Sequence, residues 1–165
     1  MERLWSPWRM EYIDGGTDGG DGCVFCDHLD EADDAGANIL YRGSSTFVIL
    51  NAFPYNSGHL IVAPLRHVGD TSELTVDERT ELMHVTCRSV DIVRTVLGAH
   101  GFNIGMNLGS VAGAGIPGHL HMHVVPRWGG DTNFMPVVGE TKVLPELLEQ
   151  TRTKLQPHFD RLHGD

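Results

Sequence analysis

The chain has 165 residues, of which 41% are hydrophobic and 21% charged, as expected for one globular domain with a single core. Its 22 acidic residues outnumber its 12 basic residues and give a formal net charge of −10, which disfavours nucleic acid or an anionic membrane as a partner. No apolar run approaches the roughly 20 residues of a membrane helix, and the N-terminus lacks the apolar core of a signal peptide. We therefore expect a cytoplasmic protein.

The N-terminal part contains a stretch without apolar side chains. Residues 14–22 consist only of Asp, Gly and Thr, so residues 1–22 are predicted to form an arm and a flexible loop. Residues 23–135 are expected to form the folded domain, and residues 136–165 a C-terminal extension with a helix. Residues 30–37 are a second polar connector.

Short β-rich segments follow this connector. Thr46–Leu50 and Leu60–Ala63 are bounded by Asn, Pro, Gly or Ser, which is typical of strands in an antiparallel meander, and Pro64 closes the second. Phe102–Leu108 and Leu120–Pro126 are predicted as further strands. The last of them alternates strictly between polar and apolar positions at its start.

One long helix is predicted between the two groups of strands. Thr75 and Glu78 form a capping-box pattern, and apolar residues then recur at helical spacing until Gly98. We expect a helix over Val76–Leu97, with Cys87 as a small packing residue inside it.

A second helix is predicted near the C-terminus. Pro145 suits its first turn and Pro157 is expected to follow its end, so its predicted range is Pro145–Leu155. Together these elements indicate an α+β fold, in which an antiparallel sheet of about five strands carries one long helix and a C-terminal helix.

The most informative segment is Gly118–Pro126, in which three histidines alternate with apolar residues. On a strand, His119, His121 and His123 project from one side about 7 Å apart, while the apolar residues enter the core. A solvated strand face is the simpler alternative, but three histidines at period two rarely arise by chance. Parallel side chains converge poorly on one ion, so the row suits an extended anionic substrate such as a polyphosphate.

The loop before this segment supports the same interpretation. Residues 113–118 lack bulky side chains near the turn, so backbone N–H groups can closely approach phosphate oxygens. A glycine loop alone is weak evidence, but beside a histidine row it indicates phosphate binding.

Residues 119–125, His-Leu-His-Met-His-Val-Val, match the His-φ-His-φ-His-φ-φ motif, in which φ is apolar, of the histidine-triad family of nucleotide hydrolases and transferases. Residues 51–64, and especially residues 57–64, resemble the family's earlier strand pair. Residues 126–134 are similar to the branch that includes bacterial diadenosine tetraphosphate phosphorylases. The resemblance covers residues 23–126.

The resemblance implies a histidine-triad fold, a homodimer with a continuous sheet, and a nucleotide or dinucleoside polyphosphate as substrate. It also implies nucleotidyl transfer at the α-phosphate through a nucleotidyl-histidine intermediate. Water resolves this intermediate in a hydrolase and inorganic phosphate in a phosphorylase. A nucleoside phosphoramidase and a non-catalytic nucleotide-binding protein are the alternatives. The motif does not require Mg²⁺, although polyphosphate substrates often carry it.

The resemblance also assigns roles to the histidines. His121 is the expected nucleophile, because a neutral imidazole with one nitrogen held as N–H by a carbonyl presents the other as a lone pair. His123 and the backbone N–H groups near Gly115 and Ile116 would stabilise charge on the transferring phosphate. His59, on a different strand, resembles the histidine that braces the triad from behind.

Further binding residues follow from the resemblance. Asn51, Phe53 and Pro54 match the region that holds ribose and base, and Asn107 matches a phosphate or ribose contact; the alternative is that these are ordinary turn and strand residues. The family frequently has Gln or Ser a few residues before the triad, where this chain has Gly and Ile. A side-chain contact to the bridging oxygen is therefore not predicted there.

Cys23 and Cys26 have the Cys-x-x-Cys spacing of a zinc knuckle but no second cysteine pair, so further ligands must come from elsewhere. His67 and His119 are the candidates, with His28 as the alternative. This pattern resembles the structural zinc of galactose-1-phosphate uridylyltransferases and of many bacterial histidine-triad proteins. Such a site would tie the N-terminal segment to the sheet and fix His119. A redox pair and two unligated thiols are the other interpretations.

Overall fold

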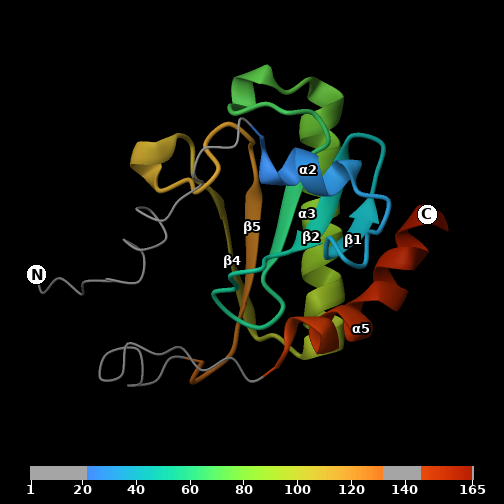
Figure 1. The fold of residues 1–165 in the computed structure, drawn as a ribbon. Helices are drawn as coiled ribbons and strands as arrows, with labels where there is room; N and C mark the ends of the chain where they lie inside the picture. The colour runs from blue at the N-terminus through green and yellow to red at the C-terminus, as the bar shows by residue number, and fades with distance from the viewer. Residues whose placement is uncertain (1–21, 132–145, 165) are drawn as a thin grey trace, which may run out of the picture.

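The computed structural model describes residues 22–131 and 146–164 (Figure 1). In chain order the regular elements are α2 (Val24–Asp30), β1 (Ile39–Arg42), β2 (Thr46–Leu50), β3 (Leu60–Pro64), α3 (Val76–Leu97), β4 (Gly101–Met106), β5 (Met122–Arg127) and α5 (Leu148–Phe159). Short 3-10 helices lie at Thr71–Glu73, Ser110–Ala112 and Asp160–Gly164. The predicted N-terminal arm and all of its flexible loop except Gly22 lie outside the described residues.

The strands form one antiparallel sheet in the order β1-β2-β3-β5-β4. β5 lies between β3 and β4, and His123 is in register with Ile61 on β3 and with Gly105 on β4. The strand that carries part of the histidine motif is thus held on both sides. This architecture confirms the α+β prediction, and the strand that we did not assign individually is β1.

Both faces of the central sheet are covered. On β2, Val48 and Leu50 belong to a core cluster shared with α3, whereas Phe47 and Ile49 belong to a second cluster with Phe25 of α2. Figure 1 shows the long α3 behind the sheet and α2 across its opposite side. Because alternate residues point to opposite faces and both faces are packed, all five residues of β2 are buried.

The structure confirms the predicted bounds of α3. Thr75 and Glu78 form the capping box, and Gly98 ends the helix in the left-handed conformation with φ of 64°. Cys87, however, is exposed, and the prediction that it packs in the core is wrong. It follows the buried Val85 by two residues, which is about 200° around the helix. No helix among the described residues is both long and apolar enough to cross a membrane.

The C-terminal helix differs from its predicted range. It covers Leu148–Phe159 and contains Pro157, whereas we expected it to end before that proline. Leu155 and Phe159, one turn apart, are both fully buried in the core cluster of α3, and this packing outweighs the hydrogen bond that proline removes. Pro145, the predicted first-turn residue, lies outside the described residues.

The strands around the histidine motif are shorter than expected. β4 ends at Met106 instead of Leu108, and β5 begins at Met122 instead of Leu120. His119 and His121 therefore precede the regular ladder, and their side chains need not follow the alternation of a strand.

Candidate functional site

Among the described residues, four potential metal ligands lie close together around His119, in the segment that precedes β5. The ligand atoms of Cys23, Cys26, His67 and His119 all lie within 4.8 Å of one another. His119 Nδ1 is 3.3 Å from the sulfur of Cys23 and 3.7 Å from that of Cys26, and His67 Nδ1 is 3.4 Å from the sulfur of Cys26. Around a tetrahedral zinc ion, with bonds of about 2.3 Å to sulfur and about 2.0 Å to nitrogen, a sulfur and a nitrogen ligand are about 3.5 Å apart. The donor set and its spacing therefore fit zinc.

Local sequence explains how the two cysteines reach this cluster. Cys23 is the N-cap of α2 and Cys26 lies in its first turn, so their three-residue spacing places both on one side of the helix. Phe25 is buried, and its ring contacts those of His119 and His121 edge-on at centroid distances of 5.2 and 5.5 Å. α2 is thereby anchored against the histidine motif.

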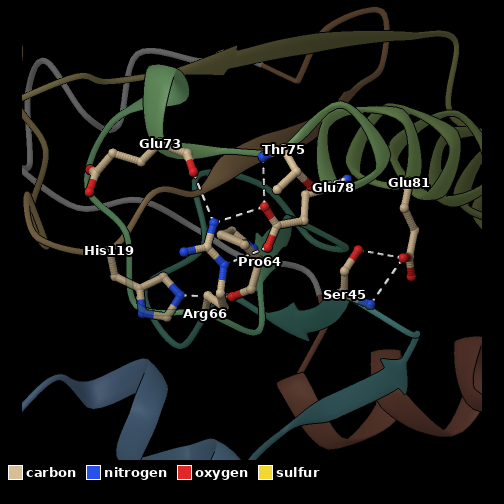
Figure 2. Close-up of polar contacts among 8 residues, drawn as sticks. All are labelled: Ser45, Pro64, Arg66, Glu73, Thr75, Glu78, Glu81 and His119. Carbon is tan, nitrogen blue, oxygen red and sulfur yellow. Dashed lines mark hydrogen bonds and ion pairs between the residues drawn. The ribbon is translucent and has the colours of Figure 1, made fainter.

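A hydrogen bond fixes the orientation of the His119 ring. His119 Nε2 lies 2.8 Å from the carbonyl oxygen of Pro64 (Figure 2). Since a carbonyl can only accept, Nε2 carries the proton and Nδ1 presents its lone pair to the two cysteines. Burial lowers the pKa of His119, which favours the neutral imidazole that a metal ion requires. Both ring nitrogens of His119 are therefore engaged, Nδ1 by the cysteines of the cluster and Nε2 by the carbonyl of Pro64.

The other interpretations of the cysteine pair fit less well. Burial, and then the hydrogen bond with Cys23, raise the pKa of Cys26 to about 11, whereas a redox-active cysteine needs a lowered thiol pKa. His28, the alternative ligand, instead has its Nδ1 3.0 Å from a carboxylate oxygen of Glu31. Its ring is not in the cluster that the structure describes.

His121 is prepared for nucleophilic chemistry. Its Nδ1 lies 2.8 Å from the carbonyl oxygen of His119, so Nδ1 donates its proton and Nε2 carries the lone pair. The residue is 5% exposed, and this burial lowers the pKa of His121 and keeps the ring neutral near pH 7. A neutral imidazole with a directed lone pair is what attack at phosphorus requires.

The hydrogen bond with His59 determines which ring nitrogen of His123 carries the proton. The backbone N–H of Tyr55 and the side-chain amide of Asn51 both approach His59 Nδ1, at 3.1 and 3.2 Å. Because Nδ1 accepts both, Nε2 of a neutral His59 carries the proton and donates it to His123 Nδ1 at 3.0 Å. A neutral His123 then keeps its own proton on Nε2 as a donor.

Tyr55 had no role in our sequence-based predictions. Its ring stacks on those of His59 and His123, with centroids 4.8 and 5.9 Å away, and covers this pair of histidines. The only sequence signal was its position directly after Pro54, since we matched Asn51, Phe53 and Pro54 to the region that holds ribose and base.

The predicted nucleotide-binding residues lie in two loops. Asn51 accepts the backbone N–H of Phe53 at 2.9 Å, and the ring of Phe53 is 71% exposed; Pro54 follows in the same loop. Asn107 donates to the carbonyl oxygen of Gly113 at 3.3 Å, which links the end of β4 to the glycine loop.

The glycine loop adjoins the histidine motif directly. Gly115 and Ile116 are half-buried, and the carbonyl oxygen of Ile116 accepts the backbone N–H of His119 at 3.3 Å. The loop therefore leads straight into the motif, and its backbone lies beside the segment that carries the three histidines.

An ion pair at Arg66, the residue before the metal-ligand candidate His67, was also missed from the sequence. Arg66 donates from Nε and Nη2 to the carboxylate of Glu78, at 2.7 and 2.9 Å, and from Nη2 to the carbonyl oxygen of Glu73 (Figure 2). Glu78 also accepts the backbone N–H of Thr75. Because Arg66 precedes His67, this pair fixes the metal-ligand segment to the start of α3.

Comparison with known proteins gives a consistent result. A family model described as "HIT domain" matches residues 33–130. A protein of Mycobacterium tuberculosis named AP-4-A phosphorylase is 40% identical over 98% of this chain and 86% of its own length. The asymmetrical bis(5'-nucleosyl)-tetraphosphatase of Schizosaccharomyces pombe is 32% identical over 58% of this chain and 52% of its own.

The structural comparison agrees. A zinc-bound histidine triad family protein from Mycobacterium smegmatis superimposes with a TM-score of 0.70 at 26% identity. The match covers 88% of this chain and 99% of that protein.

Proposed function

The chain belongs to the HIT family of nucleotide hydrolases and transferases, and we propose that it is a phosphorylase acting at the α-phosphate of diadenosine tetraphosphate. One observation carries the catalytic part of this proposal: the carbonyl of His119 holds the Nδ1 proton of His121 and leaves Nε2 as a lone pair. The extensive similarity to the mycobacterial AP-4-A phosphorylase supports the substrate and the acceptor.

The proposed reaction has two displacements. His121 Nε2 attacks the α-phosphorus, the bond from phosphorus to the bridging oxygen breaks, and ATP leaves. Inorganic phosphate then attacks the adenylyl-histidine, the phosphorus–nitrogen bond breaks, and ADP leaves with the neutral histidine restored. His123 donates from Nε2 to the phosphate oxygens, and positioning with electrostatic stabilisation supplies most of the rate.

The two loops supply the proposed contacts to the nucleotide. The backbone N–H groups near Gly115 and Ile116 bind phosphate oxygens, and Asn107 orients this loop or contacts the ribose. Phe53 and Pro54 form the side of the site that meets the base and ribose, with Asn51 at the start of the same loop. The exposure of Phe53 supports a role in stacking on a ligand.

A product assay tests the acceptor. Diadenosine tetraphosphate should yield equimolar ADP and ATP only when inorganic phosphate is present. Formation of AMP and ATP in phosphate-free buffer would instead establish the hydrolase alternative, which the similarity to the fission yeast tetraphosphatase supports.

Replacement of the nucleophile tests the mechanism. His121→Asn should lower turnover by a factor of about 10³ or more, as expected when a covalent route is lost, while AMP binding persists in calorimetry. His84→Asn is the matched control, because His84 is an exposed histidine on α3. Retention of activity in His121→Asn would exclude the assigned nucleophile.

We further propose zinc as the occupant of the cluster formed by Cys23, Cys26, His67 and His119. The spacing of its donors and the zinc-bound histidine triad relative support this choice. Bound there, zinc would supply cross-linking of α2 to the end of β3 rather than chemistry on the substrate. Mg²⁺ with the substrate stays a prediction.

The domain limits and the homodimer also stay proposals. β4 is an edge strand of the described sheet, and it and the following segment expose Ile104, Leu108 and Val111, which supports pairing with a second copy along this edge. Light scattering after size-exclusion chromatography should give twice the chain mass. α5 packs in the same core as α3, so the proposed extension from residue 136 includes a helix that is integral to the domain.

A further inference from the structure

The segment after β5 has a sequence that served above only to indicate a branch of the family. Arg127 ends β5, and Trp128, Gly129, Gly130 and Asp131 follow. The backbone N–H of Asp131 donates to the carbonyl oxygen of Trp128 at 3.2 Å, and Gly130 has φ of 81°. This is a tight turn with glycine at the position that needs a positive φ. The turn brings Asp131 back onto Arg127.

Asp131 is the centre of a compact hydrogen-bond network. Arg127 donates to both of its carboxylate oxygens, at 2.6 Å from Nε and 2.9 Å from Nη2, and the backbone N–H of Trp128 donates at 3.2 Å. The Asp131 side chain is only 10% exposed. The hydrogen bonds from Arg127 hold the pKa of Asp131 well below its ordinary value, so the carboxylate is charged at neutral pH.

The network extends from the end of β5 to the loop before His59. The side-chain amide of Asn56 donates to Asp131 Oδ2 at 2.8 Å and to the carbonyl oxygen of Pro126 at 2.9 Å. Asn56 is thereby held against the strand that carries His123. Arg127 also donates to Asn103 on β4 at 2.8 Å. The network is therefore attached to both β4 and β5.

Asn56 occupies a critical place in that loop. It directly follows Tyr55, whose backbone N–H donates to His59 Nδ1, and its own carbonyl oxygen accepts the backbone N–H of His59 at 3.1 Å. A displacement of Asn56 would therefore move the donor that decides which nitrogen of His59 carries the proton.

We propose that Asp131 is a positioning residue for the nucleotidyl transfer: through Asn56 it keeps the Tyr55 N–H on His59, so that His59 donates to His123. The proposal rests on the proposed function only for its kinetic consequence. Asp131 contacts no reacting atom. It acts through Asn56 and the loop before His59 on the tautomers of His59 and His123.

The first test is spectroscopic and needs no turnover. In Asp131→Asn the side chain keeps its shape but loses its charge and one acceptor. The ¹⁵N resonances of His59 should change from a single Nε2–H tautomer to a mixture of tautomers in the substrate-free protein. Asp91→Asn is the matched control, since Asp91 forms an exposed ion pair with Arg94 on α3. An unchanged His59 tautomer in folded Asp131→Asn would overturn the proposal.

The second test is kinetic and separates positioning from folding. Asp131→Asn should lower kcat about tenfold to hundredfold, as is typical for groups that orient a functional histidine, with little change in KM or in AMP affinity. Asn56→Ala should give the same loss, and the double variant should be no worse than either single one, because both act along one path. Multiplicative losses in the double variant would contradict the path through Asn56.

These readouts also separate this proposal from the proposed function. If the wild-type protein turns over no diadenosine tetraphosphate, the phosphorylase proposal fails. The effect of Asp131→Asn on the tautomer of His59 still tests the positioning role of Asp131. If turnover is found and Asp131→Asn leaves both kcat and the tautomer unchanged, the positioning role alone is lost.

Discussion

The histidine motif has two ends that are held in different ways. At one end, His119 is engaged through Nδ1 by the cysteine cluster and through Nε2 by the carbonyl of Pro64. At the other end, His123 is held by His59, and His59 by hydrogen bonds from a surface loop. His121 lies between them and depends on the backbone of the first. The same residue type thus serves three purposes within five positions.

This difference shows that partners, rather than the strand, set the chemistry of each imidazole. Hydrogen bonds to backbone carbonyls set the tautomers of His119, with its proton on Nε2, and of His121, with its proton on Nδ1. The tautomer of His123 is set by the hydrogen bonds that run through His59. At the metal end, side chains from α2, from the segment after β3 and from the segment before β5 lie together around the buried His119, and we expect changes there to affect stability first. The loop end is held by hydrogen bonds and by the stacked ring of Tyr55, with no cluster of metal ligands in the described part of the chain, and changes there should affect catalysis first.

The largest expected effect comes from breaking the metal end. Cys23→Ser and Cys26→Ser should each abolish stoichiometric zinc and lower the free energy of unfolding, by about 4 kcal/mol if zinc in the wild type is present at a thousandfold excess over its Kd. Plasma emission spectrometry of the purified proteins and urea unfolding measure the two quantities. Chelation of wild-type zinc should give the same loss of stability.

His28→Asn is the control for this prediction, because His28 lies beside the knuckle but its ring interacts with Glu31. It should keep its full zinc content. Loss of zinc in His28→Asn, or full zinc content in Cys23→Ser, would show that the ligand set differs from the described cluster.

The loop end is tested by a nearly isosteric change. Asn51→Asp replaces the amide donor to His59 Nδ1 with a carboxylate that can only accept, and so favours a proton on that nitrogen. The hydrogen bond to His123 is then weakened or reversed, and kcat should fall about tenfold. Steady-state kinetics measures this effect, and zinc content should stay unchanged.

Asn38→Asp makes the same chemical change on β1's side of the fold, where the residue lines a surface hollow beside α5. It should leave kcat unaltered. Loss of zinc from Asn51→Asp would show that the two ends of the histidine motif are not independent. This would contradict the expectation that a change at the loop end affects catalysis and leaves the metal end intact.

The sequence predicted the parts of this site that depend on periodicity and local signals. The bounds of α3 followed from a capping box, an apolar repeat and a glycine, all local features. The ligands Cys23 and Cys26 followed from their spacing, His67 and His119 were the candidates to complete the site, and the family resemblance supported this set. The sequence could not show that the ladder begins only at Met122, because the start of a strand depends on its neighbours.

Two of the residues that were missed act over a long sequence separation. Asn56 and Asp131 are joined across 75 positions, and no local pattern marks such a pair. Glu78 was assigned only to the helix cap, although its carboxylate also holds Arg66. Polar networks of this kind become visible only once the fold brings their members together.

The smallest expected effect concerns two carboxylates on α3 (Figure 2). Hydrogen bonds from Arg66, and then from Thr75, lower the pKa of Glu78 from 4.5 to about 2. Partial burial alone would raise the pKa of Glu81, but hydrogen bonds from Ser45 and Ser44 lower it from 4.5 to about 2. A carboxylate whose pKa is lower in the folded state stabilises the protein at pH values above its unfolded-state pKa. This stabilisation is lost as the pH falls toward 2.

Glu78→Gln and Glu81→Gln should therefore each reduce the loss of stability between about pH 4.5 and pH 2, measured by urea unfolding of the metal-free proteins. At pH 7 the two variants should differ. Glu78→Gln weakens the tie between Arg66 and α3 beside His67 and should speed the release of zinc to a chelator by a few-fold. Glu81→Gln should not, because the Glu81 carboxylate on α3 instead accepts hydrogen bonds from the turn between β1 and β2. Equal release rates would show that the cluster holds its own geometry without support from α3. Faster release in Glu78→Gln alone would place this ion pair among the groups that hold the metal end together.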